Sequence, residues 1–150
     1  MRVFATVEEL VAAAGDDLGE SSWHTITQEQ INGFAEATGD DQWIHVDAVR
    51  AAAGPFGTTI AHGYLTLSLV PMLMREVQEL RTRSMEINYG LDRVRFLTPV
   101  PAGSRVRGRV TVANVTPVDG GVQVTYDVTI ELEGSEKPAA IVNPIYRYIR

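Results

Sequence analysis

Cysteine is absent from the 150-residue sequence, which excludes disulfide bonds, thiolate metal sites and a cysteine nucleophile. Long hydrophobic runs are also lacking, because the longest apolar region, residues 60–74, is interrupted by His62 and Pro71. A membrane-spanning helix needs about 20 apolar residues, so this region is expected to lie in a protein core. The chain opens without a basic stretch followed by an apolar run, so the sequence predicts no secretory signal and a cytoplasmic location.

What remains is the composition of a folded domain, with 45% hydrophobic and 21% charged residues. A disordered chain would contain fewer apolar residues and a larger charge imbalance. The length suits one domain covering residues 1–150. The formal net charge of −6 argues against a general nucleic-acid binder, which needs a basic surface.

The positive charge is concentrated in one region. Residues 81–109 contain seven arginines against the acids Glu86 and Asp92. Two interpretations are open from the sequence. Arginines that alternate with apolar residues along strands form a solvated outer face of a sheet. Alternatively, the arginines bind the phosphates of a small ligand, for which the forked donors of the guanidinium group are well suited.

The first half of the chain contains helix signals. Residues 6–14 predict a short helix, and a capping box at Thr27 predicts the start of a second helix that ends at Gly39. Residues 48–53 predict a third helix. The polar segment 40–45 lies between the second and third helices, so we expect its side chains to be presented on a loop.

The middle and the second half of the chain predict one apolar helix and a sheet. Residues 59–79 are apolar on nearly every side, which is typical of a helix buried all round, and Pro71 is expected to bend it. The predicted strands, where apolar residues alternate with polar ones, are residues 88–96, 105–112, 122–133 and 139–149. Together these elements predict an α+β fold in which an antiparallel sheet wraps around the helix. One sheet cannot cover the whole helix, so the N-terminal helices or a second subunit must cover the rest.

Asp40 and His45 are the leading candidates for chemistry, because a carboxylate and an imidazole five residues apart on a loop can converge on one small volume. An imidazole exchanges protons near neutral pH, and a neighbouring carboxylate can act as a second proton carrier. Two other interpretations are open: Asp40 caps the helix end region, or Asp40 and Asp41 are simply solvated. The spacing also does not distinguish Asp40 from Asp41 as the partner of His45. His24 has no acid near it in the sequence and is interpreted as a surface or packing residue.

His62 and Gly63 stand at the start of the apolar helix. The first turn of a helix has free backbone N–H groups, and glycine allows a ligand to approach them closely. The Gly63 N–H therefore either stabilises an oxyanion or the glycine serves tight packing. His45 and His62, with a neighbouring aspartate, are also a possible zinc ligand set, although the sequence has no local metal-binding motif.

Two segments together resemble the hydratase-2 motif of the MaoC-like dehydratases, which include the (R)-specific enoyl-CoA hydratases. These segments are GDDQWIHVD at residues 39–47 and GPFGTTIAHGY at residues 54–64. A later segment, INYGLDRVRFLTPVPAGSRVRGRV at residues 87–110, is similar to single-domain bacterial members of the family. The resemblance extends from about Thr25 to the end of the chain. It implies a single hot-dog domain, with the sheet wrapped around a long central helix, and a homodimer in which two sheets join edge to edge.

The resemblance also implies roles for individual residues. Asp40 and His45 correspond to the catalytic pair, and Gly63 corresponds to the donor of the oxyanion-hole N–H. Family members commonly have Asn-Pro where this chain has Gln42-Trp43, a departure that bears on the loop shape and on acyl-chain preference. The residues expected to contact substrate are Gln42, Trp43, His62, Tyr64, Asn88 and Arg95.

The reaction implied by the resemblance is the reversible syn hydration of a trans-2-enoyl-CoA to the (R)-3-hydroxyacyl-CoA. The thioester itself makes C3 electrophilic, so neither a metal nor a redox cofactor is expected. Two alternatives are kept beside this reading. One is an acyl-CoA thioesterase on the same fold. The other is a non-catalytic acyl-thioester-binding subunit of a larger dehydratase assembly, which the Gln42-Trp43 departure would suit.

Overall fold

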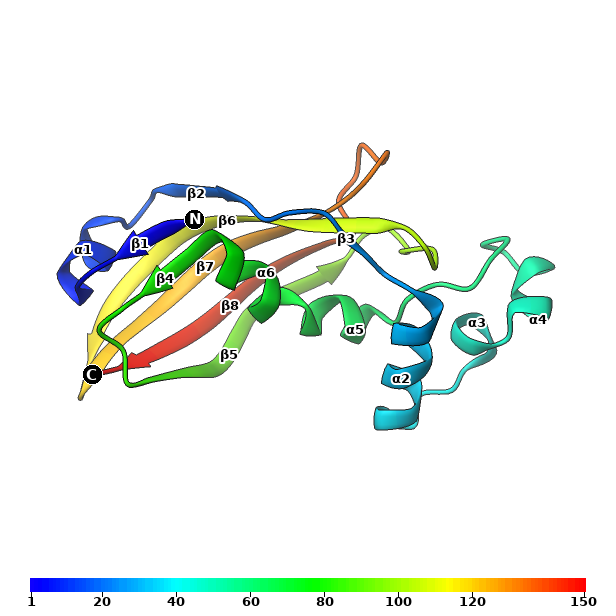
Figure 1. The fold of residues 1–150 in the computed structure, drawn as a ribbon, viewed down its shortest axis with the longest axis horizontal. Helices are drawn as coiled ribbons and strands as arrows, with labels where there is room; N and C mark the ends of the chain where they lie inside the picture. The colour runs from blue at the N-terminus through cyan, green and yellow to red at the C-terminus, as the bar shows by residue number, and fades with distance from the viewer.

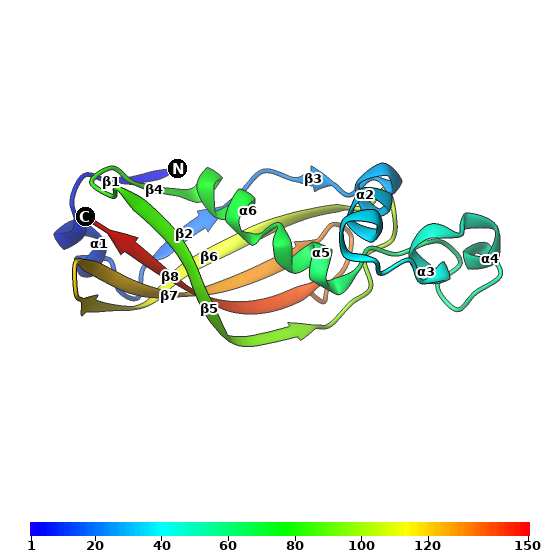
Figure 2. The same ribbon diagram turned by 90° about the horizontal axis from the view of Figure 1, so that it is seen from below.

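A curved antiparallel sheet forms the body of the computed structural model, which describes residues 1–150, and a helical segment crosses one face of the sheet (Figures 1 and 2). Its strands are β2 (Asp17–Glu20), β3 (His24–Thr25), β5 (Met85–Phe96), β6 (Arg105–Val118), β7 (Gly121–Leu132) and β8 (Ala140–Ile149). They follow the order β2-β6-β7-β8-β5, and β3 also pairs with β6. The helices are α1 (Val7–Ala12), α2 (Gln28–Thr38), α3 (Trp43–Val46), α4 (Ala48–Ala52), α5 (Gly63–Ser68) and α6 (Val70–Val77).

The core lies between the sheet and the helices α5 and α6. Every second residue of β7 and β8 is buried, because successive side chains of a strand point to opposite faces of the sheet. Val110, Val128 and Val142 belong to this inner face, and they join Leu65 and Leu73 of the two helices in one apolar cluster. The predicted α+β architecture, with an antiparallel sheet around an apolar helical segment, is confirmed.

The apolar segment does not form the single long helix that the sequence predicts. It divides into α5 and α6 at Leu69, two residues before Pro71. Proline cannot donate a backbone hydrogen bond and its ring clashes with the preceding turn, so the helix restarts at this point. Tyr64 is 69% exposed and Met72 37% exposed, so the prediction of burial on every side is wrong for the single chain. No helix is both long enough and apolar enough to cross a membrane.

Four short strands, β1 to β4, were not predicted from the sequence. β1 (Arg2–Phe4) and β4 (Gln78–Leu80) pair in parallel beside the main sheet, and β4 occupies the end of the segment that was predicted to be helical. Each of these two strands has three residues, which is too short for an alternating pattern to be detected. The predicted first helix is confirmed as α1, whose N-cap Thr6 accepts a hydrogen bond from the Glu9 N–H.

The helices α2, α3 and α4 extend from one end of the sheet and form what we call the helical lobe (Figure 1). As predicted, the Thr27 side chain caps α2 by accepting a hydrogen bond from the Gln30 N–H. Gly39 ends α2 with a φ of 76°, a left-handed conformation that glycine adopts without strain. The expected loop between α2 and α4 contains one helical turn, α3, which follows Gln42.

Three of the seven clustered arginines lie on the outer face of the sheet and are paired with acids. Arg105 pairs with Glu133, Arg107 with Glu20 and Glu131, and Arg109 with Asp17 and Glu20. The partners lie on or directly after the neighbouring strands β2 and β7. For these three residues the structure favours the solvated-face interpretation over phosphate binding.

Strand β5 forms an edge of the main sheet and exposes apolar side chains. It pairs with β8 on one side and with no strand on the other. Its exposed apolar residues are Met85, Ile87, Tyr89, Leu91 and Phe96. An edge strand of this kind presents unpaired backbone groups and apolar surface that favour pairing with another chain.

Candidate active site

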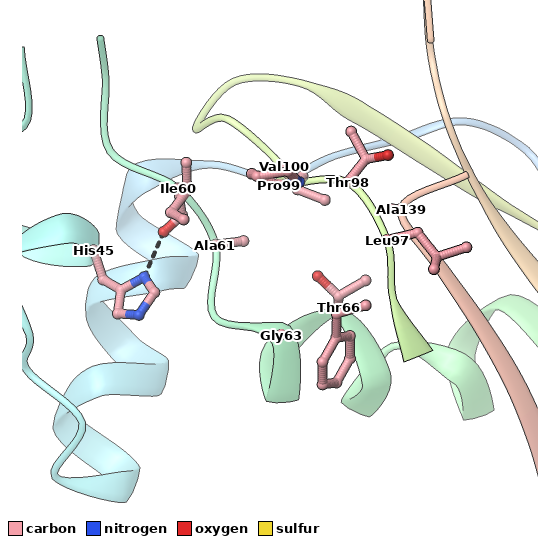
Figure 3. Close-up of a pocket in the computed structure, with 11 residues that line it drawn as sticks. His45, Ile60, Ala61, Gly63, Thr66, Leu97, Thr98, Pro99, Val100 and Ala139 are labelled. Atoms are coloured by element: carbon pink, nitrogen blue, oxygen red, sulfur yellow. Dashed lines mark hydrogen bonds between the residues drawn. The ribbon is translucent and has the colours of Figure 1, made fainter. Parts of the chain in front are cut away.

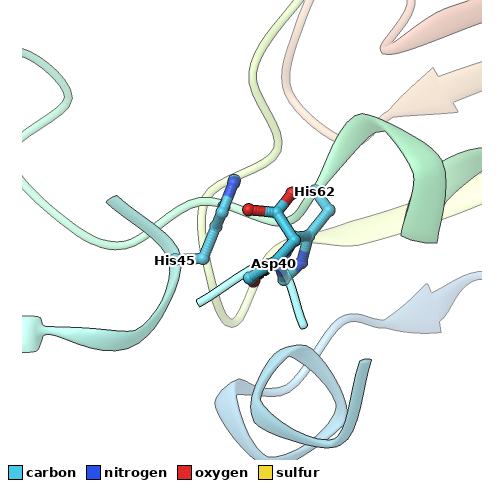
Figure 4. Close-up of side chains that lie close together, drawn as sticks. All are labelled: Asp40, His45 and His62. Atoms are coloured by element: carbon cyan, nitrogen blue, oxygen red, sulfur yellow. Dashed lines mark hydrogen bonds between the residues drawn. The ribbon is translucent and has the colours of Figure 1, made fainter. Parts of the chain in front are cut away.

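Three side chains from separate segments meet where the helical lobe joins the sheet. Asp40 follows α2, His45 lies in α3, and His62 directly precedes α5 (Figure 4). One ligand-type atom from each residue lies within 4.8 Å of the others. His45 is 7% exposed and His62 is 2% exposed, whereas Asp40 is exposed. A solvent-accessible carboxylate therefore lies against two buried imidazoles.

Local structure explains how Asp40 and His45 come together. The left-handed Gly39 reverses the chain after α2, so that Asp40 leaves the helix axis. The next four residues lead into α3, in which the His45 N–H donates a hydrogen bond to the Gln42 carbonyl. Gln28 of α2 then fixes this turn, because its side-chain amide donates to the His45 carbonyl at 2.7 Å.

The His45 ring is oriented by a hydrogen bond of 2.7 Å between its Nδ1 and the main-chain oxygen of Ile60 (Figure 3). A carbonyl oxygen only accepts hydrogen bonds, so in the neutral ring the proton lies on Nδ1. Nε2 then carries the lone pair. This arrangement leaves Nε2 as the atom of His45 that can accept a proton or hold a water molecule.

The His62 ring is fixed in a similar way on the other side of His45. Its Nε2 donates a hydrogen bond of 2.8 Å to the main-chain oxygen of Asp40. The His62 ring stacks on the His45 ring with 3.8 Å between centroids and 24° between planes. Phe34 of α2 packs against His62 with 4.9 Å between centroids. His62 is therefore held between α2 and α3 by two rings and one hydrogen bond.

The same stacking argues against a shared metal ion on Asp40, His45 and His62. An imidazole binds a metal along a lone pair in its ring plane, at about 2.1 Å for zinc. Two nearly parallel planes that are separated by a stacking distance do not meet at a point that close to both rings. The zinc alternative left open by the sequence is therefore disfavoured by the orientation of its two histidines.

A cavity of about 420 Å³ opens beside His45 (Figure 3). The residues that line it are His45, Ile60, Ala61, Gly63, Thr66, Phe96, Leu97, Thr98, Pro99, Val100 and Ala139. Gly63 is the first residue of α5, so its N–H has no intrahelical acceptor. A Cβ at this position would lie 2.8 Å from the Phe96 ring, so tight packing also requires glycine here.

Asp40 and Asp41, which the spacing could not distinguish, have different surroundings. The Asp40 side chain lies with His45 and His62. Asp41 instead lines a shallow hollow with Asn32 and Glu36 of α2. The geometry therefore selects Asp40 as the partner of His45.

None of the six residues expected to contact substrate lines the cavity. Gln42 is exposed and precedes α3, and the Trp43 ring contacts Gly54 and the guanidinium of Arg50. His62 contacts His45 and Asp40 but does not line the cavity.

Tyr64, Asn88 and Arg95 also lie outside the cavity lining. Tyr64 makes an edge contact with the ring of Phe96, which does line the cavity. Asn88 lines a different hollow of about 280 Å³ between the helices and β5. Arg95 is exposed and donates to the Val94 carbonyl.

Several residues of the site were not identified from the sequence. Gln28 donates to the His45 carbonyl and accepts a hydrogen bond from the Thr59 hydroxyl, so it joins α2 to the chain before α5. Thr66 and Thr98 line the cavity, and the buried Thr98 hydroxyl has no protein hydrogen-bond partner. Thr66 could have been identified as a site residue because it lies three residues after Gly63 in the predicted helix. No local sequence pattern identifies Gln28 or Thr98 as a residue of the site.

His24 has a partner that the sequence does not reveal. Its Nε2 lies 2.5 Å from an Oε1 of Glu76 in α6. Glu76 also accepts hydrogen bonds from the N–H and the hydroxyl of Ser22. Hydrogen bonding from the Ser22 hydroxyl is the main cause that lowers the pKa of Glu76 below its usual value of 4.5. His24, interpreted from the sequence as a surface or packing residue, is thus partly buried and engaged by the Glu76 carboxylate.

Comparisons with known proteins agree with the fold and the motif. A family model described as a MaoC like domain matches residues 9–133. The 3-hydroxyacyl-thioester dehydratase Z of Mycobacterium tuberculosis is 54% identical over 150 residues, covering 99% of each chain. The R-hydratase PhaJ1 of Pseudomonas aeruginosa superimposes with a TM-score of 0.75 at 23% identity, covering 91% of this chain and 82% of that one. A chain of the ChsH1–ChsH2 complex of M. tuberculosis gives a TM-score of 0.68 at 19% identity, covering 91% and 98%.

A sheet wrapped around a central helical segment, with a carboxylate and an imidazole beside a cavity at its end, is the arrangement of a hot-dog protein. The chain belongs to the MaoC-like dehydratase family, as the family model and the 54%-identical relative show. It is accordingly a hydro-lyase of the MaoC type, and the resemblance inferred from the sequence is confirmed.

Proposed function

We propose that this chain catalyses the reversible syn addition of water to a trans-2-enoyl-CoA, giving the (R)-3-hydroxyacyl-CoA. This narrows the hydro-lyase class to one substrate type and one product configuration. The names of two similar proteins support it: one refers to 3-hydroxyacyl thioesters and the other to an R-hydratase.

One observation carries the proposal. His45 and Gly63 line the same cavity, and the Asp40 carboxylate lies beside the His45 ring. The wall of the cavity thus offers an imidazole with a free Nε2 and a backbone amide, and the carboxylate that can accept a proton lies next to the imidazole. These are the groups that water addition to an unsaturated thioester requires.

In the hydration direction, the Gly63 N–H donates a hydrogen bond to the thioester carbonyl and stabilises the enolate character that develops as water attacks. Asp40 accepts a proton from the water as its oxygen bonds to C3. His45 orients the water through Nε2, and the proton that Asp40 has accepted then passes through the His45 Nε2 to C2. One water molecule is consumed, and both side chains return to their starting protonation states. Dehydration follows the same steps in reverse.

The acyl chain is assigned to the cavity, because its walls include Ile60, Leu97 and Val100. Burial of methylene groups in such a site is favourable by about 0.8 kcal/mol each. For the phosphates of coenzyme A we propose the clustered arginines Arg81, Arg93 and Arg95. They are exposed and make no ion pair with an acid, in contrast to the arginines on the outer face of the sheet.

The chain is further proposed to act as a homodimer joined through β5. The exposed apolar residues of this edge strand and of α5 support the proposal, because each would be covered by a second copy. The ChsH1–ChsH2 neighbour is a complex of two different chains, so a distinct partner is the competing arrangement. Sedimentation of the purified chain at the mass of a single copy would contradict the homodimer.

Enoyl absorbance with crotonyl-CoA tests the reaction directly. We expect turnover by the wild type and a loss of about 100-fold or more in kcat for Asp40→Asn, the usual range for removing a general base. Asp41→Asn is the matched control and is expected to retain wild-type kcat within about twofold, because Asp41 lies outside the cluster.

The product assignment is tested in the same reactions. Chiral analysis should give the (R)-3-hydroxyacyl-CoA. Release of free thiol, detected with a thiol-reactive dye, would instead indicate a thioesterase. Binding of enoyl-CoA without any turnover would indicate a non-catalytic subunit. A folded Asp40→Asn variant with unchanged kcat would refute the proposed role of Asp40.

A further inference from the structure

His62 is the most deeply buried polar residue of the site, yet it does not line the cavity. We propose that His62 is a positioning residue that fixes Asp40, His45 and Gly63 relative to one another through its ring and its Nε2–H. The inference rests on the proposed function, because it concerns the geometry of that reaction. It replaces the substrate contact that the sequence led us to expect of this residue.

His62 contacts or adjoins each of the three groups to which the proposed reaction assigns a role. Its Nε2–H holds the main-chain oxygen of Asp40 at 2.8 Å. Its ring stacks on His45 at 3.8 Å. Its own carbonyl carbon is bonded to the Gly63 nitrogen, so a fixed His62 also fixes the direction of the Gly63 N–H. One side chain thus contacts or adjoins all three groups to which the reaction assigns a role.

The three groups that His62 joins come from separate segments of the chain. Asp40 follows α2, His45 lies in α3 and Gly63 begins α5. Asp40 itself is exposed, and no side-chain hydrogen bond holds its carboxylate in place. The bond from His62 to its main-chain oxygen is therefore the contact that ties Asp40 to the buried part of the site.

The position of His62 is only 2% exposed, yet it is occupied by a polar ring. Because the Asp40 oxygen can only accept, the neutral His62 ring carries its proton on Nε2. The other nitrogen, Nδ1, is buried without a hydrogen-bond partner. Burial of an unpaired polar atom is unfavourable, and an aromatic hydrocarbon would stack on His45 without it. The Nε2–H donor is what a hydrocarbon ring would lack.

Two matched substitutions separate the contributions of the donor and the ring. His62→Gln keeps an amide donor that can reach the Asp40 oxygen but loses the ring. His62→Phe keeps a ring to stack on His45 but loses the donor. We expect His62→Phe to lower kcat for crotonyl-CoA by about 10-fold or more, since a small misplacement of reacting groups has a large effect on rate. His62→Gln should stay within about threefold of wild type.

The Michaelis constant distinguishes positioning from substrate binding. Because His62 does not line the cavity, KM should change by less than about twofold in both variants. A large rise in KM with unchanged kcat would instead restore the substrate-contact role. Wild-type kcat in a folded His62→Phe variant, or equal losses in both variants, would overturn the importance of the donor.

A spectroscopic measurement on the wild type needs no variant to fold. Long-range proton–nitrogen correlation spectra of the histidine rings should show His62 protonated on Nε2 and His45 protonated on Nδ1 when both are neutral. The opposite tautomer at His62 would overturn the inference. If the wild type lacks enoyl-CoA turnover, the proposed function fails. If the wild type is active and the His62 results above are not obtained, only the positioning role fails.

Discussion

The protein contains two histidine–carboxylate pairs, and they differ in how much of their hydrogen-bonding capacity is already used. His24 and Glu76 lie in direct contact at 2.5 Å, and Ser22 supplies two further hydrogen bonds to the same carboxylate. His45 and Asp40 lie close together without a direct hydrogen bond, and His45 is held instead by the Ile60 carbonyl.

The difference separates a pair whose carboxylate is already hydrogen-bonded from the pair to which we assign the reaction. A carboxylate that already accepts three hydrogen bonds stabilises the contact between α6 and the segment before β3, and it has little capacity left to accept a proton. The His45 ring, which the Ile60 carbonyl holds through Nδ1, keeps its Nε2 free at the wall of a cavity, and the Asp40 carboxylate beside it makes no side-chain hydrogen bond. Histidine beside an acid is therefore a weak indicator of catalysis unless the reacting nitrogen is left unpaired.

Replacing each histidine with glutamine tests this comparison most strongly, because only the His45 variant is expected to lose activity. His45→Gln removes the group that holds the water, and we expect kcat with crotonyl-CoA to fall about 100-fold or more. His24→Gln serves as the matched control and should leave kcat within about twofold. A large loss of kcat in the His24 variant, with its fold intact by circular dichroism, would show that the two pairs are not separate in function.

A smaller effect on rate is expected from the support of the reactive pair. Gln28→Leu removes the donor that holds the His45 carbonyl and the acceptor for the Thr59 hydroxyl, so the turn containing His45 loses its anchor on α2. We expect kcat to fall by about 10-fold, because modest misplacement of a catalytic group slows reaction strongly. Gln30→Leu on the same helix is the control, since Gln30 is exposed. Equal kcat in both variants would argue against an anchoring role.

The smallest effect concerns stability and its dependence on pH. Glu76→Gln should lower the free energy of unfolding by about 1 kcal/mol at pH 7, at the low end for charged hydrogen bonds because the pair is partly exposed. The pKa of Glu76 is lowered in the folded protein, chiefly by the Ser22 hydroxyl. The stabilisation is thus present above the unfolded value, near 4.5, and is lost as pH falls through the lower folded value.

Thermal unfolding of the two proteins from pH 7 to pH 3 measures this effect. The difference in Tm between wild type and Glu76→Gln should be largest near neutral pH and should close below about pH 4.5. A difference that grows on acidification would contradict the assigned sign. The kcat of Glu76→Gln should remain close to wild type.

Much of the fold was predictable because its signals are local. The Thr27 cap and Gly39 end mark α2 within a dozen residues, and the alternation in β6, β7 and β8 marks their inner faces. The interruption of the central helix at Leu69 was only partly anticipated from Pro71. Residues on both sides of the proline favour a helix, so the sequence did not show the boundary between α5 and α6. The exposure of Tyr64 depends on which side of the helix the sheet covers, and the sequence does not give this.

The candidate site was predictable in its members but not in its arrangement. The motif identified Asp40, His45 and Gly63, whereas the spacing could not distinguish Asp40 from Asp41. The two aspartates are neighbours in the sequence, and only the direction of the chain after Gly39 places one of them beside His45. The contacts of His62 were not predicted, because its partners, the Asp40 oxygen and the His45 ring, lie 22 and 17 residues away in the chain.

The sequence by itself determined the elements whose causes act over a few residues: helix caps, glycine turns, strand alternation and the identity of a family motif. The tertiary structure decided which polar groups are paired and which remain free. His24 finds Glu76 across 52 residues, and the His45 Nδ1 finds the Ile60 oxygen across 15. Hydrogen bonds and stacking act over a few ångströms, so these partners are set by how the elements pack and not by their order in the chain.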